Sequence, residues 1–241
     1  MPNWVINNVT IESENAETIS KLKELLTKED GGVTFNKAVP MPKSLDTSST
    51  IESVMAACAA KYAIEKYGVD AVGGKEIRTE FHGTKTVSKW ASECDNNHFG
   101  DDQAKIWWDN YENYGCFDWY NWRIENWGTK WDACESSHCL SLDGLTLTLD
   151  FETAWSTPLE FFSKLSKMYP DAKIDVKYAD ENFGYNCGEY GLCENEPDYN
   201  YEREPENPEE FAHEMWGYSE DDFDEEGMLI DKCDLPDEEN D

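Results

Sequence analysis

The feature that most restricts the fold is a series of three segments between Leu145 and Glu181. In "LTLTLDFETAW", Leu145, Leu147, Leu149 and Phe151 recur at every second position, which is typical of a strand with one buried face. The next segment, "STPLEFFSKLSKMYP", has apolar residues at helical spacing and ends at a proline. "AKIDVKYADE" then alternates again. These segments predict a strand, a helix and a second strand.

An equivalent strand and helix are predicted near the N-terminus. Residues 3–13 alternate as a strand, with Asn7 as a polar residue on the apolar face, and residues 14–32 have helical spacing. Another strand is expected just after Gly128. Without the residues between, the order is βαββαβ, which predicts an α+β, ferredoxin-like antiparallel sheet with both helices on one face.

The predicted domain contains a large, mostly helical insertion at about 33–128, between its first helix and second strand. Within it, residues 50–67 and 103–127 have helical patterns. The whole ferredoxin-like domain is expected to span residues 1–197. Residues 198–241 are expected to form an acidic, aromatic-containing C-terminal extension, with a short helix around 209–216. Residues 182–202 fit a hairpin that extends the sheet.

The formal net charge of −32 is concentrated at the C-terminal end. Residues 171–241 hold 26 acidic and 4 basic residues, whereas residues 1–170 hold 26 acidic and 16 basic residues. Such a surface repels phosphate groups and anionic membranes and attracts basic protein surfaces. We therefore expect no direct nucleic acid binding and no membrane binding.

The eight cysteines and the N-terminal sequence bear on the cellular compartment. "MPNWVINNVTIES" has neither the basic nor the apolar region of a signal peptide. Thiols in a chain that is not exported stay reduced. A cytoplasmic protein with free cysteines is expected. The sequence makes no prediction about its oligomeric state.

Four sequence segments together resemble a known family: "MPNW", "PMPKSL", "WYNWRIENWGTKWDA" and "FETAWSTPL". They are similar to the Api92-like family, also described as the YubB ferredoxin-like domain, over roughly residues 1–190. The resemblance implies a ferredoxin-like fold and an origin in a bacteriophage or a conjugative plasmid, and the expected location is the host cytoplasm if the gene belongs to a phage. It implies no catalytic residues.

The tryptophan-rich segment has two interpretations. Exposed aromatic rings beside cationic side chains could hold a nucleotide or another small ligand. Alternatively, the same rings pack in the core, as large aromatic side chains usually do. The candidate ligand-binding residues are Trp122, Arg123, Glu125, Asn126, Trp127, Lys130, Trp131 and Trp155.

No metal, cofactor or catalytic residue is predicted, and the chain is more consistent with a binding protein than with an enzyme. "CESSHC" at residues 134–139 lacks the usual spacing of a zinc site. The segment from Asp222 imitates a calcium-binding loop but has Cys233 where a glutamate is required.

The acidic extension gives the leading functional hypothesis, because aromatic residues are interleaved with its carboxylates. We expect these carboxylates to bind a host protein with a basic surface, as a nucleic-acid mimic that inhibits a restriction or CRISPR system does. The candidate partner-binding residues are Asp198, Glu202, Glu204, Glu209, Glu210, Trp216, Asp221, Asp222, Asp224, Glu225 and Glu226.

Overall fold

The computed structural model describes residues 3–95, 99–219 and 222–223 and forms two compact units. The first unit contains the chain up to Thr34 and the chain from Trp131 onward. The second unit contains Phe35–Lys130. The predicted insertion, residues 33–128, covers nearly the same residues as the second unit.

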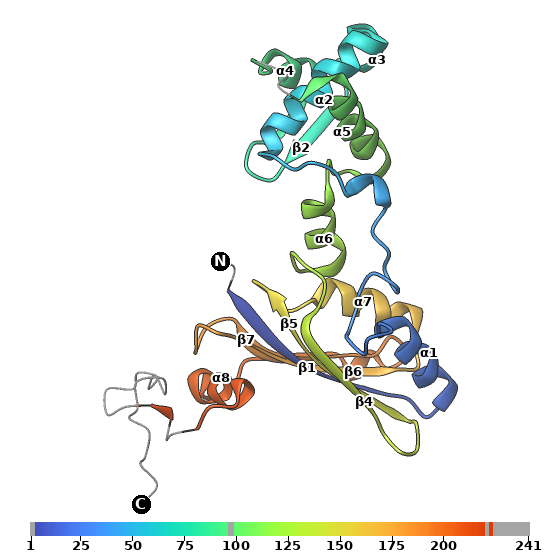
Figure 1. The fold of residues 1–241 in the computed structure, drawn as a ribbon, viewed down its shortest axis with the longest axis vertical. Coiled ribbons are helices and arrows are strands. Elements are labelled where there is room, and N and C mark those ends of the chain that lie inside the picture. The colour runs from blue at the N-terminus through green and yellow to red at the C-terminus, as the bar shows by residue number, and fades with distance from the viewer. Residues whose placement is uncertain (1–2, 96–98, 220–221, 224–241) are drawn as a thin grey trace, which may run out of the picture. The chain divides into compact units, whose positions relative to one another are not determined.

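The first unit is built on an antiparallel sheet in the order β4-β5-β1-β6-β7-β8. The strands are β1 (Trp4–Glu12), β4 (Cys134–Leu140), β5 (Thr146–Ala154), β6 (Lys173–Asp180), β7 (Cys187–Leu192) and β8 (Tyr201–Arg203). Helices α1 (Ala16–Leu26) and α7 (Leu159–Met168) lie on one face of this sheet (Figure 1). The element order β1-α1-β4-β5-α7-β6 confirms the predicted ferredoxin-like fold.

The core of the first unit lies between this sheet face and the two helices. Val9 on β1 stands between Leu149 on β5 and Val176 on β6, and all three side chains are buried. Phe151 contacts the ring of Phe162 on α7, which identifies the helix-covered face. Because side chains alternate along a strand, Val9, Leu149, Phe151 and Val176 all point to the sheet face that the helices cover.

Asn7 lies on this buried face without breaking the strand, because its amide nitrogen finds internal acceptors. It donates to the backbone oxygen of Val5 and to the hydroxyl of Thr153, both at 2.9 Å. The polar exception in the sequence pattern is thus a buried, hydrogen-bonded side chain.

The predicted extension of the sheet is confirmed. β8 pairs with β7 and follows the short 3₁₀ turn η2 (Pro197–Tyr199). Helix α8 (Pro208–Trp216) then packs against β6 and β7. This part of the C-terminal extension therefore belongs to the folded first unit.

The second unit is built around α2 (Glu52–Tyr67). Its other helices are η1 (Lys43–Leu45), α3 (Val69–Val72), α4 (Val87–Ser92), α5 (Gly100–Tyr114) and α6 (Trp119–Trp127), and β2 (Glu76–Thr79) pairs with β3 (Gly83–Thr86) as a hairpin. Ala56, Ala59, Ala60 and Ala63 on α2 are fully buried. Their small side chains let α4 and α5 approach closely, and Trp107 fills part of the remaining space.

The helical pattern predicted for residues 103–127 is confirmed, but the chain forms two separate helices there, α5 and α6. Gly115 ends α5 in a left-handed conformation, with φ of 76°. Asp118 then begins α6 by accepting a hydrogen bond from the Tyr120 N–H. The C-terminal residue Gly115 and the N-cap Asp118 are local signals that outweigh the continuous apolar spacing.

Gly128, which ends α6, gives a test of this local geometry. Its φ is 81°, and its N–H bonds back to the oxygens of Arg123 and Ile124. The Gly128→Ala variant should lose about 1–2 kcal/mol of stability, since a Cβ disfavours this conformation. Gly74→Ala is the matched control, because its Cβ would meet open space without a positive φ. Equal denaturant midpoints for the two variants would contradict the prediction.

Candidate functional sites

The first candidate site is formed by the C-terminal extension on the sheet face opposite α1 and α7. Asp175 alternates with the buried residues Ile174 and Val176, so it points to that opposite face. Its carboxylate accepts hydrogen bonds from the hydroxyls of Tyr199 and Tyr201, the latter at 2.8 Å. Two tyrosines of the extension are therefore fastened to one strand of the central sheet.

The bonds to Asp175 also affect the pKa values of the two tyrosine hydroxyls. Burial raises the pKa of Tyr201 to about 12, and the neighbouring carboxylate acts in the same direction. The pKa of Tyr199 rises for the same two reasons. Both hydroxyls therefore remain hydrogen-bond donors at neutral pH.

Aromatic contacts hold the next part of the extension. Trp216 at the end of α8 donates its indole N–H to the backbone oxygen of Ala179 on β6, at 3.2 Å. Phe183 contacts the rings of His213, Tyr218 and Phe223. These aromatic residues pack within the first unit, which leaves the acidic residues between them on its surface.

We call the resulting surface the acidic face. Arg203 is the one lysine or arginine between residues 194 and 216, and its guanidinium lies over the Tyr201 ring. The acidic face consists of nine exposed residues: Glu194, Glu196, Asp198, Glu202, Glu204, Glu206, Glu209, Glu210 and Glu214.

The structure leaves several of the predicted partner-binding residues exposed and holds others in contacts. Asp198, Glu202, Glu204, Glu209 and Glu210 are exposed on the acidic face. Trp216 instead contacts the sheet, as described above. Asp222 accepts hydrogen bonds from Ser219. The remaining predicted residues, Asp221, Asp224, Glu225 and Glu226, lie outside the described residues.

The predicted ligand-binding residues are divided between the two units. Trp122 and Trp127 on α6 are buried, with exposures of 8% and 1%. The Trp127 indole donates to the backbone oxygen of Val39 at 2.9 Å. These two rings have almost no exposed face on which a ligand could stack. Their structural role in the core of the second unit agrees with the packing interpretation of the sequence.

Polar neighbours on α6 support the same packing. The Arg123 guanidinium lies over the rings of Trp119 and Trp127, at 5.0 and 5.2 Å from the centroids. Asn126 donates to the Trp122 backbone oxygen at 2.8 Å, whereas Glu125 is exposed.

Trp131 and Trp155 belong to the first unit. The ring of Trp131 contacts that of Trp4 on β1, with centroids 5.7 Å apart. Trp155 is 40% exposed and has a positive φ of 74°.

The second candidate site is a hollow of about 430 Å³ within the second unit. Lys130 is the one predicted ligand-binding residue on its wall. Most of the wall comes from residues that the sequence did not single out. The lining residues are Ser49, Thr50, Ile51, Glu52, Ser53, Met55, Glu80, Phe81, His82, Asp118, Trp119, Tyr120, Asn121 and Lys130.

Two carboxylates in this hollow have altered proton affinities. Burial raises the pKa of Asp118, although hydrogen bonds from the Ser49 hydroxyl and the Tyr120 N–H oppose the increase. Burial likewise raises the pKa of Glu52, which accepts bonds from the Glu80 N–H and the Asn121 amide. Asp118 could have been noticed in the sequence as an N-cap, since aspartate directly precedes the apolar α6 segment.

The candidate metal ligands do not form a centre in the described part of the chain. Within residues 3–95, 99–219 and 222–223, no three His, Cys, Asp or Glu side chains lie close enough together to hold a metal ion. Over the same residues, no helix combines the length and the apolar character needed to cross a membrane.

Comparison with known proteins addresses the family. Residues 126–228 match the family model described as the ferredoxin-like domain in Api92-like protein. The crystal structure of a protein api92 from Yersinia pseudotuberculosis is 11% identical, with 85% of this chain and 99% of that chain covered and a TM-score of 0.44. A search of curated proteins finds no match. The family model supports the predicted Api92-like resemblance, and the structural match at this score adds no argument.

The attachment of the extension can be tested by removing both phenol hydroxyls. In a Tyr199→Phe and Tyr201→Phe double variant, backbone amides of β8 should exchange with solvent on the order of tenfold faster, because two hydrogen bonds to Asp175 are lost. Exchange in β1 should not change. Tyr185→Phe is the control, since Tyr185 is exposed on the chain between β6 and β7. Unaltered exchange in β8 would show that these bonds do not hold the extension.

Proposed function

We propose that this chain, which carries the ferredoxin-like domain of the Api92-like family at residues 126–228, is a non-enzymatic protein that binds a basic surface of a partner protein. The observation that supports this function is the acidic face, where nine exposed carboxylates on the folded first unit are accompanied by Arg203 and by Lys173, which pairs with Glu196 at 2.9 Å. A polyanion that is folded presents its charges at fixed spacings, so it can match a particular basic surface.

The carboxylates of the acidic face also indicate which kind of protein the partner would be. Proteins that bind nucleic acid present lysine and arginine side chains to phosphate groups. Carboxylates of the acidic face would occupy those cationic positions. If the gene belongs to a phage or a plasmid, the partner would be a host defence protein of the restriction or CRISPR type. The chain would then act as an accessory protein that inhibits host defence.

A charge-neutralised variant tests this proposal. We replace Asp198 with Asn and Glu202, Glu204 and Glu209 with Gln, all exposed on the acidic face. At low salt, association with the partner should slow by on the order of tenfold or more, because electrostatic attraction accelerates encounter. Capture from a bacterial lysate identifies bound nucleic-acid-binding proteins, and association rates are then measured with the purified partner.

The matched control removes four exposed carboxylates elsewhere, at Glu24, Glu29, Glu65 and Glu76. Because the change in net charge is equal, only a specific role of the acidic face predicts a difference between the two variants. Added duplex DNA should reduce binding of the captured partner to this chain, because both would occupy the same basic surface. The proposal fails if the wild-type chain retains no nucleic-acid-binding protein at low or physiological salt, or if both variants bind equally.

The alternative function, binding of a nucleotide or other small ligand, is favoured by the hollow beside α6. Its volume of about 430 Å³ is in the range typical of ligand sites, about 300–1,000 Å³. Its wall carries Glu52, Glu80 and Asp118 against Lys130. Three carboxylates against one lysine would repel the negative charges of a polyphosphate. The hollow therefore suits an uncharged or cationic aromatic ligand, such as a nucleoside.

Tryptophan fluorescence tests this alternative. Titration with nucleosides should quench the emission of Trp119, which lines the hollow, more strongly than titration with nucleoside triphosphates. The quenching should disappear in Trp119→Phe and persist in Trp155→Phe, because Trp155 belongs to the other unit. A flat response to both ligand classes would exclude this function for the hollow.

A further inference from the structure

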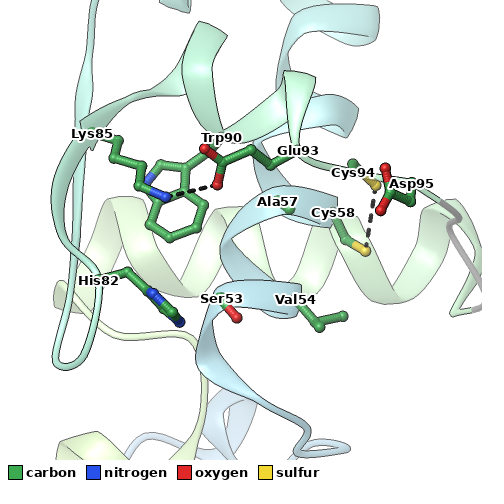
Figure 2. Close-up of a pocket in the computed structure, with 10 residues that line it drawn as sticks. All are labelled: Ser53, Val54, Ala57, Cys58, His82, Lys85, Trp90, Glu93, Cys94 and Asp95. Atoms are coloured by element: carbon green, nitrogen blue, oxygen red, sulfur yellow. Dashed lines mark hydrogen bonds and ion pairs between the residues drawn. The ribbon is translucent and has the colours of Figure 1, made fainter.

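Two cysteine thiols of the second unit are in contact. The sulfur atoms of Cys58 and Cys94 are 3.8 Å apart (Figure 2). Cys58 lies in the middle of α2, and Cys94 lies just beyond the end of α4. Both line a hollow of about 380 Å³ that is separate from the one containing Asp118 and Lys130, although the two share Ser53 and His82.

We propose that Cys58 and Cys94 form a dithiol modification site, which a small disulfide such as glutathione disulfide converts to an intramolecular disulfide. The Cys94 thiolate attacks one sulfur of glutathione disulfide, forms a mixed disulfide and releases one glutathione. The Cys58 thiolate then attacks the Cys94 sulfur and releases the second glutathione. The two cysteines together lose two electrons and two protons, and glutathione disulfide gains them as it becomes two molecules of reduced glutathione.

The geometry of the pair supports closure of this bond. The sulfurs must approach from 3.8 Å to about 2.05 Å, the length of a disulfide bond. Cys94 is outside the helical segment of α4, so its side chain can rotate without breaking a helix. Its N–H bonds to the Ala91 oxygen at 3.2 Å. Since α4 packs directly on α2, the bond would join two segments that are already in contact.

Access to the pair differs between its two members. Cys94 is partly exposed, whereas Cys58 is buried against the hollow. An incoming disulfide therefore reaches Cys94 first. Cys58 is positioned to attack the Cys94 sulfur once the mixed disulfide has formed. This order assigns Cys94 as the attacking thiol and Cys58 as the resolving thiol.

The surroundings of Cys58 set the pH dependence of closure. Burial raises the pKa of the Cys58 thiol to about 11, the neighbouring Cys94 acts in the same direction, and Lys61 opposes the shift. Charged and titratable groups on the walls of the hollow are His82, Lys85, Glu93 and Asp95. Only the thiolate is nucleophilic, so the rate of the closing step should rise as the pH increases, because burial keeps the Cys58 pKa above its usual value after Cys94 has become a mixed disulfide.

The bond would fix one wall of the hollow. Lys85 pairs with Glu93 at 2.7 Å and lies over the Trp90 ring, 4.1 Å from its centroid (Figure 2). Trp90 also donates to the Ile77 oxygen at 3.1 Å. A link from Cys94 to α2 would therefore hold the segment that carries Trp90 and Glu93 against α2.

The test uses the full chain in glutathione redox buffers, with thiols blocked after quenching and peptides mapped by mass spectrometry. We expect a Cys58–Cys94 linked peptide, formed faster at pH 8.5 than at pH 7, and reversed by excess reduced glutathione. Because this measurement uses the wild-type protein, it does not depend on any variant folding. Absence of the linked peptide under fully oxidising conditions would overturn the proposal.

Serine variants test the order of attack. In Cys58→Ser, Cys94 should accumulate as the mixed disulfide with glutathione, because no resolving thiol remains. In Cys94→Ser, Cys58 should react at least tenfold more slowly, since it is buried and rarely a thiolate. Cys139→Ser is the control and should form the linked peptide normally, because Cys139 is exposed on β4 in the other unit. Equal glutathione incorporation at Cys58 and Cys94 in wild-type protein, without a link, would also overturn the proposal.

Discussion

The second unit depends on a single repeated interaction, in which a buried indole N–H donates to a backbone carbonyl. Trp107 donates to Ser48 and Trp127 to Val39, while Trp90 donates to Ile77. An unpaired buried donor costs about 1–3 kcal/mol, so each ring can be buried only where a carbonyl is available. The first two bonds fasten the poorly periodic residues 35–51 to helices α5 and α6, and the third joins α4 to β2. The tryptophans thus organise loops as well as fill space.

The sequence predicts the central strands of the ferredoxin-like sheet well because β1, β5 and β6 are each buried on one face. That burial produces the alternation of apolar and polar residues in these three strands. Asn7 is the polar exception on the buried face of β1, and it is tolerated there because its amide has internal hydrogen-bond acceptors. The same reasoning fails in the second unit. β2 and β3 are four residues each and mostly polar, so they have no periodic signal. Across Gly115, the apolar spacing continues although the helix ends.

The candidate sites show a different limit. A tryptophan that lines a hollow and a tryptophan in a core have the same sequence appearance, and only burial separates Trp119 from Trp127. Likewise, Tyr199 and Tyr201 are interleaved with acids, and sequence alone cannot show that both contact Asp175, which lies 24 and 26 residues away. The charge of the extension is predictable from composition. Its attachment to β6 depends on long-range pairing.

The two edges of the sheet have a consequence for self-association. An exposed, regular edge strand offers unpaired N–H and C=O groups to another chain and promotes aggregation. Here one edge is β8, three residues long with Glu202 and Arg203, and the other is β4, whose register shifts between Cys134 and Ser137. Neither edge is a long, flat template. A truncation that removed β8 would leave the six residues of β7 as the new edge strand. The unpaired N–H and C=O groups of β7 could then pair with another chain, so the truncated protein should self-associate more readily.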